Sequence, residues 1–275
     1  MPTKMNSLTE GSIWKGMLLF ALPIFLGNVF QQLYNAFDAW CVGFFINDDA
    51  LAAVSSSGSL IFMMISFFQG LSMGAGVIIA RAFGAKHDQE MRKAIHTAIA
   101  FGLVTGVALT VIGVALTPVI LRWMGTPAEV LPQSISYFRY YFFGALFIVM
   151  YNIFVGILHA VGDSKHPLYY LIVATFVNIA LDLLFVLGFG MKVEGVAIAT
   201  VLSQGVSAIL VIITLMRTNN CVKIQLRKLR IHWDLLKKII GVGIPAALQM
   251  ALTSFSNVFV QGYVIHFGEA CTGGW

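Results

Sequence analysis

Two aspartates lie deep inside long apolar stretches of the sequence. Asp38 falls in the run 14–45 and Asp182 in the run 167–190, and no Lys or Arg lies deep in either run to neutralise them. An ionised carboxylate at the centre of a bilayer costs at least about 2.5–3.5 kcal/mol. Intramembrane carboxylates usually mark ion or proton pathways, so both are candidate functional residues. The plainer interpretation is a protonated aspartate that donates a hydrogen bond to a neighbouring helix.

Each aspartate has polar neighbours at helical spacing. Gln31, Tyr34 and Asp38 stand at i, i+3 and i+7. Asn178 and Asp182 stand at i and i+4. Because residues three, four and seven apart share one face of an α-helix, each group should point in one direction.

The chemistry of these side chains suits a small cation. Thr200 lies about as far beyond a short turn as Asp182 lies before it, so the two should meet in adjacent helices. Carboxylate, amide and hydroxyl oxygens are hard ligands, so we expect a cation site at Asp38, Asn178, Asp182 and Thr200. Alternatively, the two acids share one proton. The sequence does not choose between Na⁺ and H⁺, and apart from a possible Na⁺ we expect no metal and no cofactor.

Other polar residues and one proline could serve transport without binding the ion. We assign Gln31, Tyr34 and Asn152 to a substrate pocket, although Asn152 could instead hydrogen-bond a neighbouring helix. Pro23 interrupts the hydrogen-bond ladder of the first run, and this makes it a candidate hinge.

The elements that carry these residues are transmembrane helices. The 275-residue chain is 59% hydrophobic and only 11% charged, whereas soluble domains contain about 25% charged residues. A chain in lipid must satisfy its own backbone, and runs of more than about 20 apolar residues do so as helices. We therefore expect an all-α integral membrane protein, with spans near 14–45, 50–80, 94–118, 132–161, 167–190, 195–216 and 239–267.

Basic residues indicate the orientation. Of the 17 Lys and Arg residues, only Arg122, Arg139 and Lys192 fall on one side of the expected membrane. The positive-inside rule then places the N-terminus in the cytoplasm of a multi-pass protein of the cell's inner (plasma) membrane. The basic cluster at 217–238 could bind RNA, but it fits better as a topology signal that touches anionic lipid. We expect no nucleic-acid partner.

Motifs of enzyme chemistry are missing from the sequence. It contains neither a phosphate-binding loop nor the patterns His-Glu-x-x-His and Gly-x-Ser-x-Gly. Enzymatic activity is therefore not expected.

An internal repeat predicts two lobes. An offset of 222 aligns Pro23 with Pro245 and Asn35 with Asn257, among six identities in this segment. Parallel repeats of this kind occur in secondary transporters. We expect a six-helix lobe at 1–216, a basic cytoplasmic loop at 217–238 and the first helix of an incomplete second lobe at 239–275. The whole protein would then have about 444 residues. A complete seven-helix protein is the alternative.

Several motifs together resemble the multidrug and toxic compound extrusion (MATE) transporters. The resemblance covers essentially the whole chain, and the motifs occur in the family's order. They are Ala21-Leu22-Pro23, Gln31, Asp38-x-x-x-Val42-Gly43, Ala50-Leu51-Ala52-Ala53-Val54, Arg81-Ala82-Phe83-Gly84-Ala85-Lys86, Gly162-Asp163-Ser164-Lys165-His166-Pro167, Asn178-x-x-x-Asp182 and Gly195-Val196-Ala197-Ile198-Ala199-Thr200.

This resemblance implies a V-shaped exporter of two six-helix lobes, twelve helices in all. Such proteins expel cationic or amphiphilic compounds in exchange for Na⁺ or H⁺, and their cation site would fall on Asp38, Asn178, Asp182 and Thr200. Membrane lipid and a small-molecule cargo are the expected partners, and the oligomeric state stays open. The alternatives are a flippase for lipid-linked precursors, a seven-helix receptor and an inactive membrane fragment. The deep acids disfavour a flippase for anionic headgroups, and the basic-residue bias disfavours a receptor.

Overall fold

The computed structural model describes residues 12–46, 48–123, 131–217, 222–224 and 229–266. Within these ranges the protein is helical and contains no strand. The helices are α1 (Ile13–Phe45), α2 (Asp48–Gly84), α3 (Asp88–Trp123), α4 (Leu131–Phe143), α5 (Ala145–Ala160), α6 (Lys165–Leu183), the π-helical turn η1 (Leu184–Gly188), α7 (Val193–Arg217) and α8 (Trp233–His266). By length and hydropathy, six helices are suited to cross a membrane, and the bent pair α4–α5 makes a seventh span.

The expected fourth span, 132–161, is broken rather than continuous. The backbone bends by 48° between α4 and α5, at Gly144. A Cβ atom at Gly144 would overlap the side chain of Val201 in α7. Glycine therefore allows the bend to lie directly against α7. Helices α3 and α8 begin several residues before the expected spans 94–118 and 239–267, because a first turn with charged residues precedes each apolar segment.

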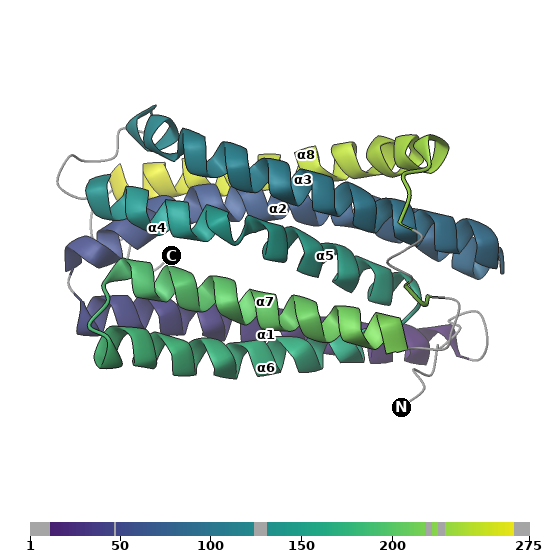
Figure 1. Ribbon diagram of the computed structural model, residues 1–275, viewed down its shortest axis with the longest axis horizontal. Helices are drawn as coiled ribbons and strands as arrows, with labels where there is room; N and C mark the ends of the chain where they lie inside the picture. Colours follow the sequence, from purple (N-terminus) through teal and green to yellow (C-terminus); the bar gives the residue numbers. More distant parts are fainter. Residues whose placement is uncertain (1–11, 47, 124–130, 218–221, 225–228, 267–275) are drawn as a thin grey trace.

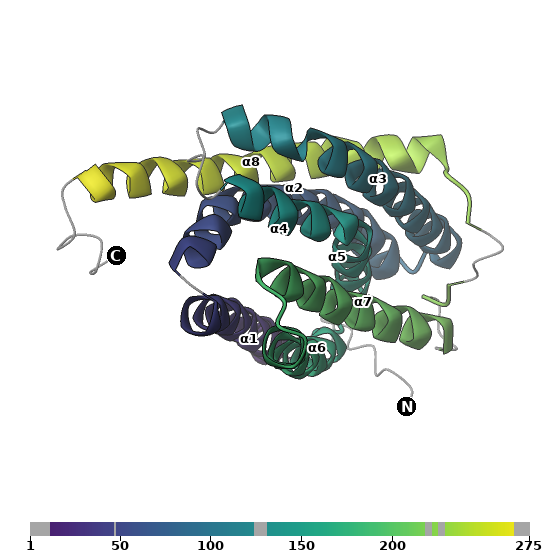
Figure 2. The ribbon, with the colours of Figure 1, turned by 60° about the vertical axis from the view of Figure 1, so that its left-hand side comes forward.

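The helices form two groups. Helices α1, α6 and α7 lie side by side in one, while α2, α3, α4 and α8 form the other (Figures 1 and 2). Helix α5 contacts both groups through α2, α3 and α7. The expected fold class is confirmed: an all-α lobe of six spans followed by a seventh span.

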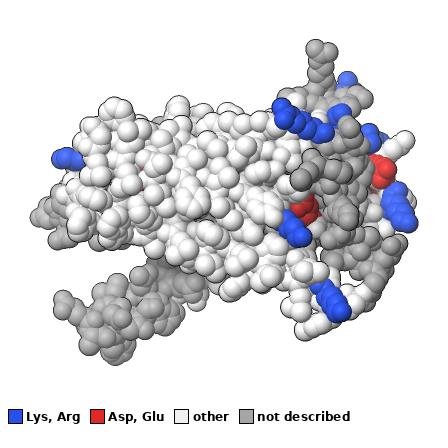
Figure 3. Space-filling model, turned by 90° about the horizontal axis from the view of Figure 1, so that it is seen from below, with Lys and Arg blue, Asp and Glu red and all other residues white. Residues whose placement is uncertain are grey.

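Charged side chains gather at one end of the helices (Figure 3). The face shown there is otherwise free of visible Lys, Arg, Asp and Glu along most of its length, apart from a basic side chain at the opposite end. The end rich in Lys and Arg carries the α2–α3 turn and the beginning of α8. We call it the basic end.

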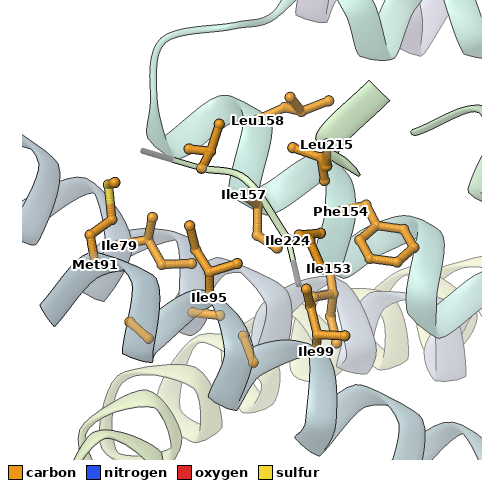
Figure 4. Close-up of a cluster of buried hydrophobic side chains, with 14 of the residues drawn as sticks. Ile79, Met91, Ile95, Ile99, Ile153, Phe154, Ile157, Leu158, Leu215 and Ile224 are labelled. Atoms are coloured by element: carbon orange, nitrogen blue, oxygen red, sulfur yellow. The ribbon is translucent and has the colours of Figure 1, made fainter. Parts of the chain in front are cut away.

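Near the basic end, buried aliphatic side chains from α2, α3, α5, α7 and α8 form a continuous core (Figure 4). Val222 and Ile224, from the segment that joins α7 to α8, are also buried in it. The Ile224 backbone N–H donates to the Leu215 carbonyl oxygen at 3.3 Å. Part of the expected basic loop therefore packs against the lobe.

Two Gly-x-x-x-Gly motifs, Gly70 to Gly74 on α2 and Gly102 to Gly106 on α3, allow unusually close helix contacts. On α3, a Cβ atom at Gly102 would overlap Ile153 of α5, and one at Gly106 would lie 2.7 Å from Leu146. Lipid provides little hydrophobic driving force between helices, so such close packing contributes much of their association.

The second motif brings α2 and α8 together backbone to backbone. A Cβ atom at Gly74 would lie 2.5 Å from the Gly243 Cα atom, and one at Gly70 would overlap the Ala247 backbone. We call Gly70, Gly74, Gly243 and Ala247 the glycine seam. It joins the six-span lobe to the seventh span.

Candidate functional site

The polar face expected on α1 lies inside the lobe. Tyr34 and Asp38 are buried, with 4% and 8% of their surface exposed, and Gln31 is half-buried on the same side. On the opposite side of α1, Leu22, Phe25 and other large apolar side chains are exposed. The sequence therefore fixes which face of this helix turns inward.

Helices α6 and α7 supply the other polar side chains from either side of a short turn. Asn178 and Asp182 are fully buried on α6, and Thr200 is buried on α7. The π-helical turn η1 begins at Leu184, two residues after Asp182, and Gly190 adopts a positive φ of 64° as the chain reverses. Short π-helical turns within α-helices occur frequently at functional sites.

These residues converge on Asp38. The Thr200 hydroxyl lies 3.2 Å from Asp38 Oδ2, within hydrogen-bond distance, and 2.9 Å from the Val196 carbonyl oxygen of its own helix. Asp182 and Asn178 also lie beside the Asp38 carboxyl group, although neither forms a hydrogen bond with it. The structure thus places Asp38, Asn178, Asp182 and Thr200 in one cluster, which we call the acidic site. The role of these residues in binding a cation stays a prediction.

Most polar atoms of the acidic site have no hydrogen-bond partner among the described residues. These atoms are Asp38 Oδ1, both side-chain polar atoms of Asn178 and both carboxylate oxygens of Asp182. The Tyr34 hydroxyl beside them is also unpartnered. Buried polar groups are normally satisfied, and each one left without a partner costs about 1–3 kcal/mol. Such a cluster is suited to bind something the protein does not itself provide, such as an ion, a proton or water.

The acidic site opens into a cavity of about 510 Å³, which we call the outer chamber. Gln31, Tyr34, Asp38 and Thr200 all line it. Asn152 lines it from α5 and donates its Nδ2 hydrogen to the Ile148 carbonyl oxygen at 2.8 Å. The structure therefore brings all three residues of the expected substrate pocket to one cavity.

Sequence reasoning missed several residues of this chamber. Tyr137 and Tyr141 line it from α4, and Gln204 lines it from α7. The spacing of four between Thr200 and Gln204, and between the two tyrosines, was an available signal. Asn28 on α1 and Gln69 on α2 were also detectable as amides inside apolar runs.

Pro23 lies within α1, which the structure shows as a single helix from Ile13 to Phe45. Its ring is buried and lines a second cavity, toward the basic end. Proline removes one backbone hydrogen bond from the ladder, so α1 has a local weak point at this position. The hinge role of Pro23 stays a prediction.

Comparisons with known proteins identify the family. The MatE family model matches residues 23–184, more than half of the chain. The probable multidrug resistance protein YoeA of Bacillus subtilis (strain 168) is 35% identical over 98% of this chain. YpnP, a second probable multidrug resistance protein of the same strain, is 28% identical over 99% of this chain. The match covers 60% of YoeA and 61% of YpnP, so the chain spans about three-fifths of these relatives' length.

Solved structures show the same fold. A structure described as the outward-facing conformation of a multidrug resistance MATE family transporter superposes with a TM-score of 0.88, at 28% identity, over 96% of this chain and 59% of that one. A structure described as the inward-facing conformation superposes with a TM-score of 0.78, at 29% identity, over 88% of this chain and 55% of that one. The helices, the family model and these relatives agree that the chain is a multi-pass membrane protein that belongs to the MatE (MATE) family of transporters.

Proposed function

We propose that this chain provides the ion-binding lobe of an exporter that moves small organic compounds out of the cell in exchange for Na⁺ or H⁺. The main observation is the acidic site, where two buried carboxyl groups meet an amide and a hydroxyl and most of their polar atoms lack partners. Hard oxygen ligands of this kind suit a small cation, and an acid pair suits a shared proton.

The names of the relatives support export as the direction and drugs as the cargo. YoeA and YpnP are called probable multidrug resistance proteins, and MepA of Staphylococcus aureus, 23% identical over 94% of this chain, is called a multidrug export protein. The carboxylate of Asp38 in the outer chamber favours cationic or neutral cargo over anionic cargo. This disfavours a flippase for anionic lipid-linked precursors.

The proposed mechanism couples the ion to the shape of α1. Asp38 and Pro23 lie on the same helix, with the acid facing Asp182 and Thr200. Gaining or losing a cation changes the charge beside Asp38, and α1 can respond at the weak point that Pro23 creates. One similar solved structure is described as MATE in the bent conformation and another as MATE in the straight conformation. We place the N-terminus in the cytoplasm and the protein in the inner (plasma) membrane, because all but three of the 17 Lys and Arg residues fall on one side of the expected membrane.

Dye efflux from cells that express the intact gene product tests the proposal. Asp38→Asn and Asp182→Asn keep the side-chain volume but remove the charge, so we expect each to reduce ion-driven efflux at least tenfold. Asp234→Asn is the matched control, because Asp234 is an exposed acid in the first turn of α8. Efflux at the wild-type rate in both site variants, with all four proteins present at equal amounts, would rule out the acidic site as the coupling site.

A further inference from the structure

A groove of about 660 Å³ opens at the basic end, between the beginnings of α3 and α8. The α2–α3 turn and the first two turns of these helices line it, and we call it the charged groove. Three lysines and three acids are among its lining residues, so both signs of charge meet there. Figure 3 shows acidic side chains among the basic ones at this end of the molecule. The charged groove is therefore suited to a ligand that itself carries both charges.

The charged groove lies at the depth of lipid headgroups. Trp233 is 70% exposed and begins the apolar segment of α8 that is long enough to cross a membrane. Exposed tryptophans are typical of the boundary between membrane and water, because the ring is apolar and its N–H is polar. The residues on either side of it, His232 and Asp234, both line the charged groove. A ligand in the groove would therefore lie level with the headgroups of the surrounding lipids.

Beyond the charged groove, α8 continues with an exposed apolar face. Lys238, Val242 and Pro245 stand at i, i+4 and i+7 of this helix, and all three are exposed. Residues at this spacing share one face of a helix, so apolar side chains continue the face that Lys238 begins. An acyl chain attached to a headgroup in the charged groove can lie along this face.

Some charges of the groove are paired within the protein, and others are not. Lys238 Nζ lies 3.6 Å from Glu90 Oε1, so these two side chains neutralise each other in part. Lys86, Lys93 and Asp88 form no ion pair with any other described residue. The groove therefore offers two ammonium groups and one carboxylate to a ligand. Lysine ammonium groups bind phosphate, and a carboxylate accepts hydrogen bonds from a primary ammonium group.

The backbone conformation of Lys86 points to a role for its side chain. Its φ is 58°, in the left-handed region that favours glycine. The Lys86 N–H donates to the Phe83 carbonyl oxygen at 3.0 Å, and the His87 N–H donates to the Ala82 carbonyl oxygen at 2.9 Å. This pair of hydrogen bonds closes many helix C-termini, usually with glycine where Lys86 stands. Glycine would form the same turn without strain, so the lysine is better explained by the charge that it brings to the groove.

We propose that the charged groove binds the headgroup of phosphatidylethanolamine, with the phosphate at Lys86 and Lys93 and the primary ammonium group at Asp88. Phosphatidylcholine carries the same charges, but its quaternary ammonium group has no N–H to donate to a carboxylate. Phosphatidylglycerol brings a negative charge without a positive one, and the acids of the groove disfavour it. This inference does not depend on the proposed export activity, because lipid binding is measured without transport.

Native mass spectrometry of the full chain in detergent tests the proposal, because it counts the lipid molecules bound to each protein molecule. The probes are phosphatidylethanolamine, phosphatidylcholine and phosphatidylglycerol with identical acyl chains. We expect the wild-type protein to bind phosphatidylethanolamine at least fivefold more tightly than either of the other two. Lys165→Gln is the matched control, because Lys165 is an exposed lysine at the start of α6 that does not line the charged groove.

Lys86→Gly should weaken phosphatidylethanolamine binding at least threefold, while the midpoint of thermal unfolding stays the same or rises, because glycine relieves the left-handed strain. Asp88→Asn should reduce the preference for phosphatidylethanolamine over phosphatidylcholine to less than twofold. The inference is overturned if both variants bind phosphatidylethanolamine as the wild-type protein does, or if the wild-type protein binds all three lipids alike. Tightest binding of phosphatidylglycerol would also overturn it, since this would indicate a general attraction of anionic lipid to the basic end.

Discussion

The glycine seam and the acidic site are built on opposite principles. At the seam, α2 and α8 meet through backbone atoms, and a Cβ atom at Gly74 would lie 2.5 Å from Gly243 Cα. At the acidic site, helices α1, α6 and α7 bring together polar atoms that find few partners. The seam is packed as tightly as a backbone allows, whereas the acidic site leaves hydrogen-bonding capacity unused.

The two regions therefore contribute differently: the glycine seam holds helices together, and the acidic site is suited to binding. Close backbone packing holds helices together in lipid, where there is little hydrophobic driving force between them. Unsatisfied polar groups do the reverse, because each one lowers the stability of the fold. A protein that keeps such groups buried gives up stability at a place where it needs to bind something. Substitutions at the two regions should therefore change stability in opposite directions.

Gly74→Leu should have the largest effect. The new side chain would need space that the α8 backbone occupies, so α8 must move away from α2. Overpacking usually costs about 1–3 kcal/mol, and a backbone-to-backbone contact should reach the upper end of that range or beyond. We expect the midpoint of thermal unfolding in detergent to fall by several degrees, with a lower yield of folded protein.

Gly241→Leu is the matched control for this prediction. Gly241 is an exposed residue of α8, only two positions from Gly243, and a Cβ atom there meets nothing within 4 Å. Its variant should unfold at or slightly above the wild-type temperature, since glycine is a poor helix former. Equal destabilisation by the two leucines would show that the α2–α8 contact contributes no more than an exposed surface does.

The sequence predicted the acidic site better than the bends of the helices. Asp38 and Asp182 stood out in the sequence because each lies inside an apolar run, where burying a charge is costly and usually has a functional reason. Asn178 stood out because it lies four residues before Asp182, on the same face of the helix. The break at Gly144 was missed, because glycine in a membrane helix commonly marks close packing without a bend. The contact of Gly144 with Val201 depends on two helices far apart in sequence. The two neighbouring cavities were missed for the same reason, because residues from several helices line each of them.

Asn178→Leu should have the next largest effect, with the opposite sign. Asn178 is fully buried, and neither of its side-chain polar atoms has a partner among the described residues. Leucine has a similar volume and no polar atoms, so the substitution removes the cost of burying an unsatisfied amide. We expect an increase of about 1–3 kcal/mol in the free energy of unfolding, seen as a higher unfolding midpoint. The affinity for the coupling ion should fall at the same time.

Asn152→Leu tests whether the expected gain at Asn178 comes from removing an unsatisfied amide, or whether any Asn→Leu substitution inside the lobe raises stability. Asn152 donates to the Ile148 carbonyl oxygen, so its replacement removes a hydrogen bond that exists. The variant should show no gain in stability, or a loss of about 0.5–1.5 kcal/mol. If both leucine variants stabilise the protein alike, the unused hydrogen-bonding capacity of Asn178 is not what sets the acidic site apart.

Lys238→Ala should have the smallest effect. Lys238 Nζ on α8 lies 3.6 Å from Glu90 Oε1 on α3, and both side chains are largely exposed, at 59% and 44%. Water and salt screen such a pair, and ordering two flexible side chains offsets much of the attraction, so exposed pairs contribute about 0–1 kcal/mol. We expect the unfolding midpoint to stay within about 2 °C of wild type, and the difference to shrink further when NaCl is raised from 0.1 to 0.5 M. A larger loss that persists in high salt would mean that the basic end, and not the glycine seam alone, holds α8 against the lobe.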